Sequence, residues 1–275
     1  MVWTAAPTVL LIAALTAVSF SYAPKSLIVR KLSAEPPWSG CGAVKRWASA
    51  PRQDWREAFW VEMSHSQFGQ DVVVISLVHA LSRGGDNATP TLSGPFHYDT
   101  CLGWKGLCVE PNPQYHAKIR AARTCPLVDA CVSDEARQVE LLATGSVGHI
   151  AHRRLISMRC TTLRSILVRH WRVTYLSLDV EGHELPVLQG ADWNRTAIDF
   201  ITLENEKAAH VDYLRSRGLA PLACVGIDTL FARIPLFAAA RVWFDVNEAA
   251  LSPLCVDRDV SRCRDGDARG HNLSL

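Results

Sequence analysis

From residue 66 onward, short hydrophobic runs alternate with stretches of helical periodicity. The apolar runs predict buried strands at 106–110, 127–132, 173–180 and 198–204, with a closing pair at 219–225 and 229–234. The periodic stretches predict helices at 113–123, within 155–170 after Thr161-Thr162, from 184 and at 208–217. This alternation predicts an α/β fold with a mainly parallel sheet, an antiparallel closing strand and helices on both faces.

The first 23 residues have a different character, because they contain no charged side chain and include the apolar run VLLIAAL at 9–15. This run has the length of a signal-peptide core, and Ser21-Tyr22-Ala23 offers a cleavage pattern. Residues 7–22 fall just short of the roughly 20 residues that span a bilayer. Residues 1–23 are therefore interpreted as a signal peptide or a membrane anchor, with a buried helix as the less favoured alternative.

The rest of the chain divides by composition. Residues 24–60 mix Pro, Trp and basic residues without periodicity, which is typical of a linker or stem. Residues 61–245 carry the strand and helix pattern and are predicted to form one domain. Residues 246–275 end in a charge-dense stretch and are predicted to be a solvated extension.

Composition limits the classes of partner. The chain has 275 residues, of which 48% are hydrophobic, so it can form a sizeable core. A net charge of +2 provides no basic field for nucleic acid. Sequons at Asn87, Asn194 and Asn272 fit a lumenal protein, in which at least one of the nine cysteines would stay unpaired or pair elsewhere. We therefore expect a lumenal or secreted protein, or one associated with the membrane through residues 1–23.

Acidic residues follow three of the predicted strands, at the sheet edge where α/β folds bind ligands. Glu110 ends GLCVE, and an acid in that place can accept both hydroxyls of a ribose. The run 179–184 (DVEGHE) gathers three acids and a histidine around Gly182, which permits close approach of a ligand. The alternatives are a solvated acid at Glu110 and a helix-capping cluster at 179–184. Asp134, after the strand predicted at 127–132, is a weaker signal.

Several runs together resemble one known family. They are SQFGQD at 66–71, GWKGLCVEPNP at 103–113, LDVEGHE at 178–184, LEN at 203–205 and GIDTLF at 226–231. In this order they resemble the FkbM-type family of S-adenosylmethionine-dependent methyltransferases, over roughly residues 66–234. The resemblance implies a Rossmann-like methyltransferase sheet, S-adenosylmethionine as cofactor, and O-methylation of a hydroxyl on a glycan or small-molecule acceptor.

The resemblance also implies roles for individual residues. Glu110 would take the ribose hydroxyls, with Asn112 beside it, and Asp134 would lie near the adenine. Asp179 and Glu181 would lie near the site of methyl transfer. The proton of the acceptor hydroxyl would pass to His183 or Asp179.

One part of the family pattern is missing. The family has an apolar strand and a glycine- or alanine-rich loop before the GW motif, but residues 83–105 contain no apolar run and are too short for a strand, loop and helix. Either a piece of coding sequence is absent or the protein is a degenerate relative, with Asp86 as a surviving cofactor contact. A third alternative recruits residues 72–77 (VVVISL) as the first strand.

Two other functions remain open at this point. A non-catalytic relative would keep the fold as a glycan- or protein-binding module, which the missing loop favours. A nucleotide-sugar transferase would also use acids at strand ends, but it would normally need a divalent metal. No Asp-x-Asp pair stands near the end of a predicted strand, the pair at 265–267 lies in the tail, and no metal site is predicted.

Overall fold

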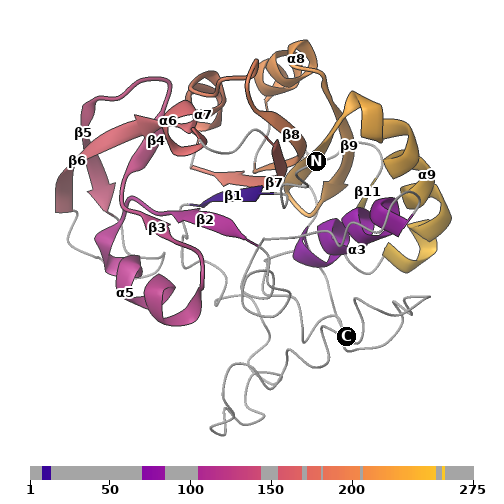
Figure 1. Cartoon of the computed structure of the whole chain (residues 1–275), viewed down its shortest axis with the longest axis horizontal. Coiled ribbons are helices and arrows are strands. Elements are labelled where there is room, and N and C mark those ends of the chain that lie inside the picture. The colour runs from indigo at the N-terminus through magenta and orange to yellow at the C-terminus, as the bar shows by residue number, and fades with distance from the viewer. Residues whose placement is uncertain are drawn as a thin grey trace, which may run out of the picture. The chain divides into compact units, whose positions relative to one another are not determined.

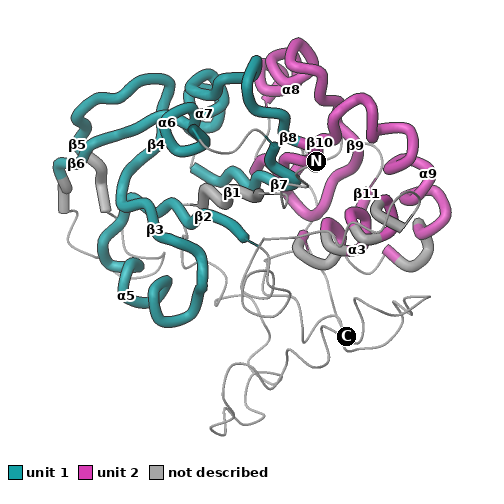
Figure 2. The backbone as a smooth tube through the Cα atoms, in the orientation of Figure 1, with its two compact units in different colours: residues 1–53, 90–198 teal, residues 54–89, 199–275 magenta. Residues whose placement is uncertain are grey.

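The computed structural model describes residues 8–13, 70–83, 105–143, 154–168, 172–180, 182–204, 207–251 and 256–257. The chain divides into two compact units (Figure 2). Unit 1 is formed by Met1–Gln53 and Pro90–Ile198, and unit 2 by Asp54–Thr89 and Asp199–Leu275. The predicted stem at 24–60 lies outside the described residues.

Unit 1 contains a parallel sheet in the order β7-β1-β2-β3 (Figure 1). Its strands are β1 (Thr8–Ala13), β2 (Gly106–Val109), β3 (Leu127–Val128) and β7 (Arg172–Asp179). Every pairing among them is parallel. Val173, Leu176 and Leu178 of β7 are almost fully buried. Such a continuous buried run is expected of a parallel strand covered on both faces, as the sequence predicted for this segment.

A second sheet of unit 1 has the order β4-β6-β5. Its strands are β4 (Cys131–Ser133), β5 (Gln138–Ala143) and β6 (Arg154–Thr162), with β4 parallel and β5 antiparallel to β6. The single strand predicted at 127–132 was therefore wrong, because the chain leaves one sheet after Val128 and enters another at Cys131. A disulfide joins Cys131 of β4 to Cys160, its register partner on β6.

Three helices of unit 1 begin at polar caps or turns. They are α5 (Pro113–Ala122), α6 (Leu163–Ile166) and α7 (Glu184–Gln189). Asn112 caps α5 through a 3.1 Å hydrogen bond from the Gln114 N–H, and Pro113 suits the first turn. Thr162 caps α6, so the predicted helix start after Thr161-Thr162 is confirmed, although the residues before it form β6 rather than helix.

Unit 2 contains an antiparallel arrangement in the order β11-β9-β10-β8. Its strands are β8 (Ala197–Glu204), β9 (Leu219–Val225), β10 (Asp228–Arg233) and β11 (Val256–Asp257). Its helices are α3 (Gln70–Arg83), α8 (Ala208–Ser216) and α9 (Ile234–Leu251). The fold is therefore mixed α/β, and the mainly parallel sheet that we expected is confined to unit 1.

Two segments of unit 2 differ from the sequence-based expectations. Residues 72–77 belong to helix α3, so they are not the first strand of the sheet. Helix α9 runs to Leu251, and Val256 pairs with Val225, so regular structure continues past residue 245 into the predicted extension. The buried side chains Ala240 and Phe244, four residues apart, show the helical periodicity that predicts α9.

Strand β1 comes from the N-terminal apolar run and lies between β2 and β7. Leu11 pairs with Cys108 on one side and with Ser177 on the other. An uninterrupted apolar sequence suits the middle of a parallel sheet as well as it suits a signal peptide. Within the described residues, no helix is long and apolar enough to cross a membrane. The assignment of residues 1–23 to a signal peptide or anchor stays a prediction.

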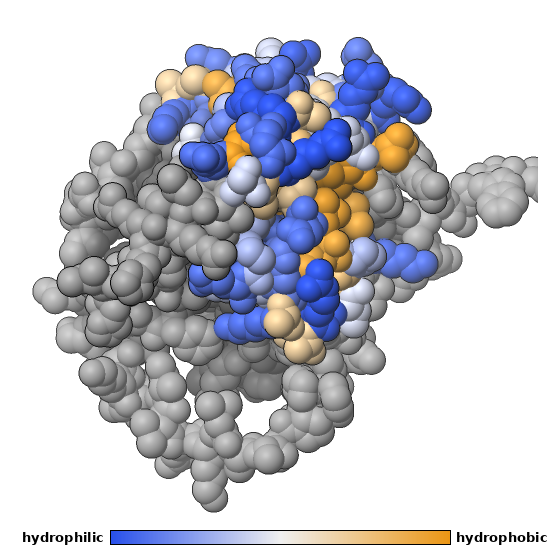
Figure 3. Space-filling model, turned by 90° about the vertical axis from the view of Figure 1, so that its left-hand side faces the viewer, coloured by the Kyte–Doolittle hydropathy of each residue, from blue (hydrophilic) through white to orange (hydrophobic). Residues whose placement is uncertain are grey.

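The surface on the side of β5, β6 and α5 is mostly hydrophilic, with a narrow run of hydrophobic residues among the polar ones (Figure 3). On α5, Gln114, Lys118 and Arg120 are exposed, whereas Ile119 is 4% exposed. The helix therefore presents one apolar side inward, as its sequence periodicity predicts.

Candidate active site

Glu110 directly follows strand β2 and forms a turn with its backbone and its side chain. Glu110 is buried, with 1% of its surface exposed. Its Oε1 accepts a 2.6 Å hydrogen bond from the Asn112 N–H, and its own N–H donates to the Val128 carbonyl at 3.2 Å. The Asn112 side chain is used to cap α5. The Glu110 carboxylate is therefore held in one orientation at the end of β2, and the solvated-acid alternative is not what the structure shows.

Strand β7 ends at Asp179, at the same edge of the sheet as Glu110. The register shows this, because Ile12 of β1 pairs with both Val109 and Leu178 and Ala13 pairs with Asp179. Glu110 follows Val109 directly, so the two acids flank the end of β1. Two strand spacings separate their backbones, which is about 10 Å. Carboxyl ends of parallel strands are where α/β sheets bind ligands.

Glu184, the last residue of the 179–184 motif, closes the turn after β7. Glu184 is 2% exposed, and its Oε1 accepts hydrogen bonds from the N–H groups of Gly182 (2.9 Å) and Val180 (3.3 Å). Gly182 has φ +92°, which explains the glycine by backbone conformation. A Cβ there would meet no protein atom within 4 Å, and the approach of a ligand to Gly182 stays a prediction. Glu184 is the acid in the first turn of α7, but its carboxylate closes the preceding turn, and α7 has no side-chain cap hydrogen bond.

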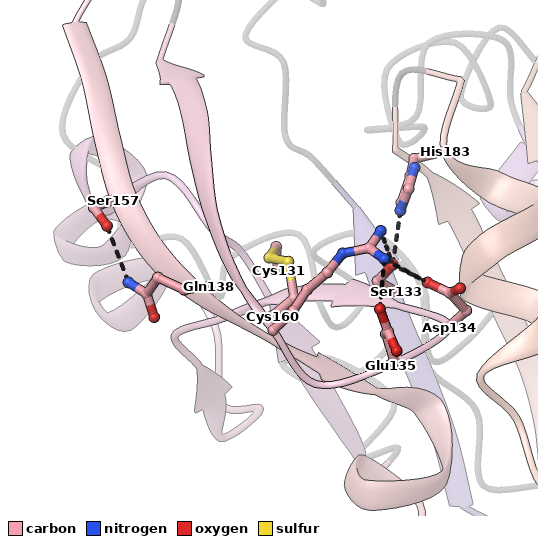
Figure 4. The surroundings of a disulfide bond; sticks show 9 residues. Cys131, Ser133, Asp134, Glu135, Gln138, Ser157, Cys160 and His183 are labelled. Atoms are coloured by element: carbon pink, nitrogen blue, oxygen red, sulfur yellow. Dashed lines mark hydrogen bonds and ion pairs between the residues drawn. A yellow bond between two sulfur atoms is a disulfide. The ribbon is translucent and has the colours of Figure 1, made fainter.

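His183 of this turn contacts a residue 50 positions earlier in the chain (Figure 4). Its Nε2 lies 2.9 Å from the Oγ of Ser133, the last residue of β4. The Ser133 hydroxyl donates to Asp134 Oδ1 at 2.6 Å and accepts from Arg137 Nη2 at 3.1 Å. The hydrogen bond from Ser133 is the main cause that lowers the pKa of Asp134 below its ordinary value. Ser133 was not predicted as a site residue.

The structure brings together some of the predicted site residues and not others. Asp134 follows β4 and lies beside Ser133 and His183, so it belongs to the second sheet rather than to the sheet of Glu110. Its side chain is exposed. Glu181 and Asp86 lie outside the described residues.

Unit 2 holds a second group of polar residues, formed by Gln70, Glu204 and Asp228. Glu204 ends β8 and is the register partner of Asp228, the first residue of β10. Gln70, at the start of α3, donates from Nε2 to Asp228 Oδ2 at 2.7 Å. Burial and the nearby Glu204 raise the pKa of Asp228 to about 7, against the opposing effect of the Gln70 hydrogen bond. The quoted runs at 66–71, 203–205 and 226–231 contain these three residues, but none was predicted as a site residue.

A known domain matches the segment of the chain that contains Glu110, Gly182 and His183. Residues 93–219 match the methyltransferase FkbM domain. The resemblance that the sequence motifs indicated is thereby confirmed for this segment. No curated protein and no solved structure gives a significant match to the chain.

The FkbM domain match includes Glu110, Ser133, Asp179 and His183, and it starts after Gln70. A methyltransferase of this kind generally uses S-adenosylmethionine. The side chains at the carboxyl edge fit that group chemically, because ribose hydroxyls donate hydrogen bonds and the sulfonium and amino groups are cations. The carboxylates of Glu110 and Asp179 could bind these groups, and Glu110 accepts the Asn112 N–H at its Oε1.

A cation site would need several acids, histidines or cysteines gathered around one point. In the part of the chain that the structure describes, no group of three or more His, Cys, Asp or Glu side chains could hold a metal ion. Within the 179–184 motif, the Glu184 carboxylate turns toward the backbone of Gly182.

Proposed function

We propose that this FkbM-type methyltransferase uses S-adenosylmethionine to methylate a hydroxyl oxygen of a sugar or small molecule, on a Rossmann-like sheet. The observation that carries the proposal is the alignment of Glu110 and Asp179 at one sheet edge, with β1 between them. A Rossmann-like sheet binds its cofactor at that edge. The family motifs assign Glu110 and Asp179 to the cofactor and to methyl transfer.

S-adenosylmethionine, when bound, supplies a methyl group on a cationic sulfur. That methyl group would pass to the acceptor oxygen, and the sulfur would leave with the electron pair as a neutral thioether. The hydroxyl proton must leave the oxygen during this displacement, and His183 or Asp179 takes it. Glu110 orients the ribose, and Asn112 holds the Glu110 carboxylate in place.

The decisive experiment is calorimetric titration of S-adenosylmethionine into the full chain and into Glu110→Gln. The amide keeps the shape of the buried side chain and can still accept the Asn112 N–H, but it loses the negative charge. Loss of charge-assisted hydrogen bonds to the ribose should weaken binding about 10-fold, or roughly 1.4 kcal/mol.

Glu140→Gln is the matched control, because Glu140 is an exposed glutamate on β5. It should bind the cofactor as the wild type does. Equal affinity of Glu110→Gln and wild type would remove Glu110 from the site. A folded wild-type protein without detectable binding would favour the non-catalytic glycan- or protein-binding alternative. An activity that a chelator leaves unchanged would distinguish the proposed methyltransferase from a metal-dependent sugar transferase.

We further propose that the protein works in the secretory pathway, lumenal or secreted. Cleavage of residues 1–23, or their insertion in a membrane, is the alternative in which β1 does not stay in the sheet. Disulfides join Cys108 to Cys125 and Cys131 to Cys160, and such bonds persist in oxidising compartments. Counting free thiols in protein recovered from secreting cells, with and without reductant, tests this. Both pairs should be unreactive until they are reduced.

A further inference from the structure

The hydrogen bonds of the Ser133 hydroxyl show which ring nitrogen of His183 carries a proton. A serine hydroxyl has one proton and two acceptor lone pairs. The proton goes to Asp134 Oδ1, and Arg137 Nη2, which can only donate, takes one lone pair. His183 Nε2, 2.9 Å away, therefore faces the second lone pair and must carry a proton itself. A neutral His183 is then the Nε2-protonated tautomer, and its Nδ1 is the acceptor.

The direction of the first hydrogen bond is supported by electrostatics. The hydrogen bond from Ser133 lowers the pKa of Asp134, and Arg137 acts in the same direction from 3.4 Å. Asp134 is thus an ionised, acceptor-only carboxylate near neutral pH, so the Ser133 proton must point toward it. Arg137 also contacts Glu135 at 3.0 Å, which divides its charge between two acids.

Ser133 also fixes where the histidine sits. Helix α7 lies between His183 and Gly190, and both ends contact Ser133. His183 contacts the Ser133 hydroxyl, and a Cβ at Gly190 would overlap the Ser133 carbonyl oxygen. The Gly190 carbonyl accepts from the Arg164 N–H at 2.9 Å, which ties the far end of α7 to α6. The imidazole is therefore held at a defined place relative to β4.

The other ring nitrogen remains available. Among the described residues, Nδ1 of His183 has no hydrogen-bond partner, and the side chain is partly exposed. In the described part of the chain, Asp134 and Arg137 bond the Ser133 hydroxyl that contacts this imidazole, Glu135 pairs with Arg137, and Glu184 is the next residue in the chain. Glu184 is engaged by the Gly182 and Val180 N–H groups, so Ser133 is the group that determines the tautomer.

We propose that Ser133 is a positioning residue that holds His183 as the Nε2-protonated tautomer, so that Nδ1 is the nitrogen that takes the proton from the acceptor hydroxyl. The inference rests on the proposed methyl transfer for its catalytic half. As the acceptor oxygen bonds to the methyl carbon, its proton moves to Nδ1. The imidazolium that forms donates from Nε2 to Ser133, which donates to Asp134, and this chain of hydrogen bonds stabilises the charge. The proton then leaves Nδ1 for water.

The test begins with NMR of the ring nitrogens in the full chain labelled at histidine, without cofactor. Loss of a signal in His183→Gln assigns His183 among the ten histidines. At a pH where the ring is neutral, wild type should show a protonated Nε2, protected from exchange by Ser133, and an unprotonated Nδ1. In Ser133→Ala the Nε2–H signal should be lost to exchange with water, and Ser133→Thr should restore it. A wild-type Nδ1–H tautomer, or an unchanged Ser133→Ala spectrum, would overturn the proposal.

Ser157→Ala is the matched control, since the Ser157 hydroxyl lies in the same sheet, on β6, and accepts a hydrogen bond from Gln138 Nε2 at 3.0 Å (Figure 4). It should leave the His183 signals unchanged. Methyl transfer supplies the second readout, with kcat about 10-fold lower in Ser133→Ala and wild-type affinity for S-adenosylmethionine. The Ser133→Thr variant should recover kcat. Correct ring signals with no methyl transfer by wild type would refute the proposed function and the role of Nδ1 while the positioning by Ser133 stands.

Discussion

Gly190 lies directly against the backbone carbonyl of Ser133, so closely that a side chain at position 190 would overlap the Ser133 oxygen. The overlapped atom belongs to the backbone of β4, which is paired to β6 and linked to it by the Cys131–Cys160 disulfide. Neither side can move cheaply, because the Gly190 carbonyl is hydrogen-bonded to the Arg164 N–H. The absence of a side chain at Gly190 is therefore what allows α7 to approach β4.

Gly190→Ala should destabilise the protein by about 1–3 kcal/mol, the usual range for overpacking a buried contact. It should also separate His183 from Ser133, so the protected Nε2–H signal of His183 should disappear. Chemical denaturation measures the first effect and ring-nitrogen NMR the second. Gln189→Ala, at the exposed preceding position, is the control and should change neither. A fully stable Gly190→Ala protein would mean that α7 does not sit on β4 as described.

Asp228 should make stability depend on pH between about 4 and 7. Its pKa is raised from 3.8 to about 7, so within this window the folded state keeps the Asp228 proton while the unfolded state loses it. This contribution to stability is fully present below the unfolded-state pKa and is lost as pH rises through the folded-state pKa. Asp228→Asn removes the titrating group and keeps an oxygen for the Gln70 amide.

The Asp228→Asn variant should therefore gain stability relative to wild type as pH rises from 4 to 8, by on the order of 2–4 kcal/mol. Urea denaturation at several pH values measures this difference. Asp212→Asn, an exposed acid on α8, is the control and should follow the wild-type pH profile. A difference between Asp228→Asn and wild type that stays constant with pH would show that Asp228 ionises normally.

Strand β1 is tested through its backbone. Leu11 lies between Cys108 of β2 and Ser177 of β7, and proline at this position cannot donate to either neighbour. Leu11→Pro should lower the stability of the full chain by about 3 kcal/mol and speed amide exchange in β2 and β7. Leu11→Val keeps the N–H and should behave as wild type.

Residues 8–13 cannot be in this sheet and in a bilayer at the same time. If Leu11→Pro leaves stability and exchange unchanged, β1 is not part of the folded domain in solution. The signal-peptide or anchor prediction for residues 1–23 would then account for the apolar run. The two disulfides do not depend on this outcome, because Cys108, Cys125, Cys131 and Cys160 all lie outside the N-terminal segment.

The elements that depend on local sequence were predicted well. Helix α5 was expected at 113–123 and runs from Pro113 to Ala122, because Asn112 and Pro113 mark its start. Strands β7 and β8 were recognised as continuous apolar runs. Two signals were overlooked, the hydrophobic alternation in 138–143 that marks β5 and the helical periodicity of α9.

The sequence by itself determined which residue types stand at the strand ends, and its motifs were sufficient to indicate the FkbM methyltransferase domain. Tertiary structure alone decided which of these residues meet. Ser133 and His183 are 50 residues apart. Their contact requires β4 to lie in the second sheet and α7 to pack on β4 through Gly190. The partner of Leu11 in β1 likewise lies almost 100 residues away, at Cys108. Strand pairing and side-chain hydrogen bonds depend on partners distant in the chain, and no local pattern encodes those partners.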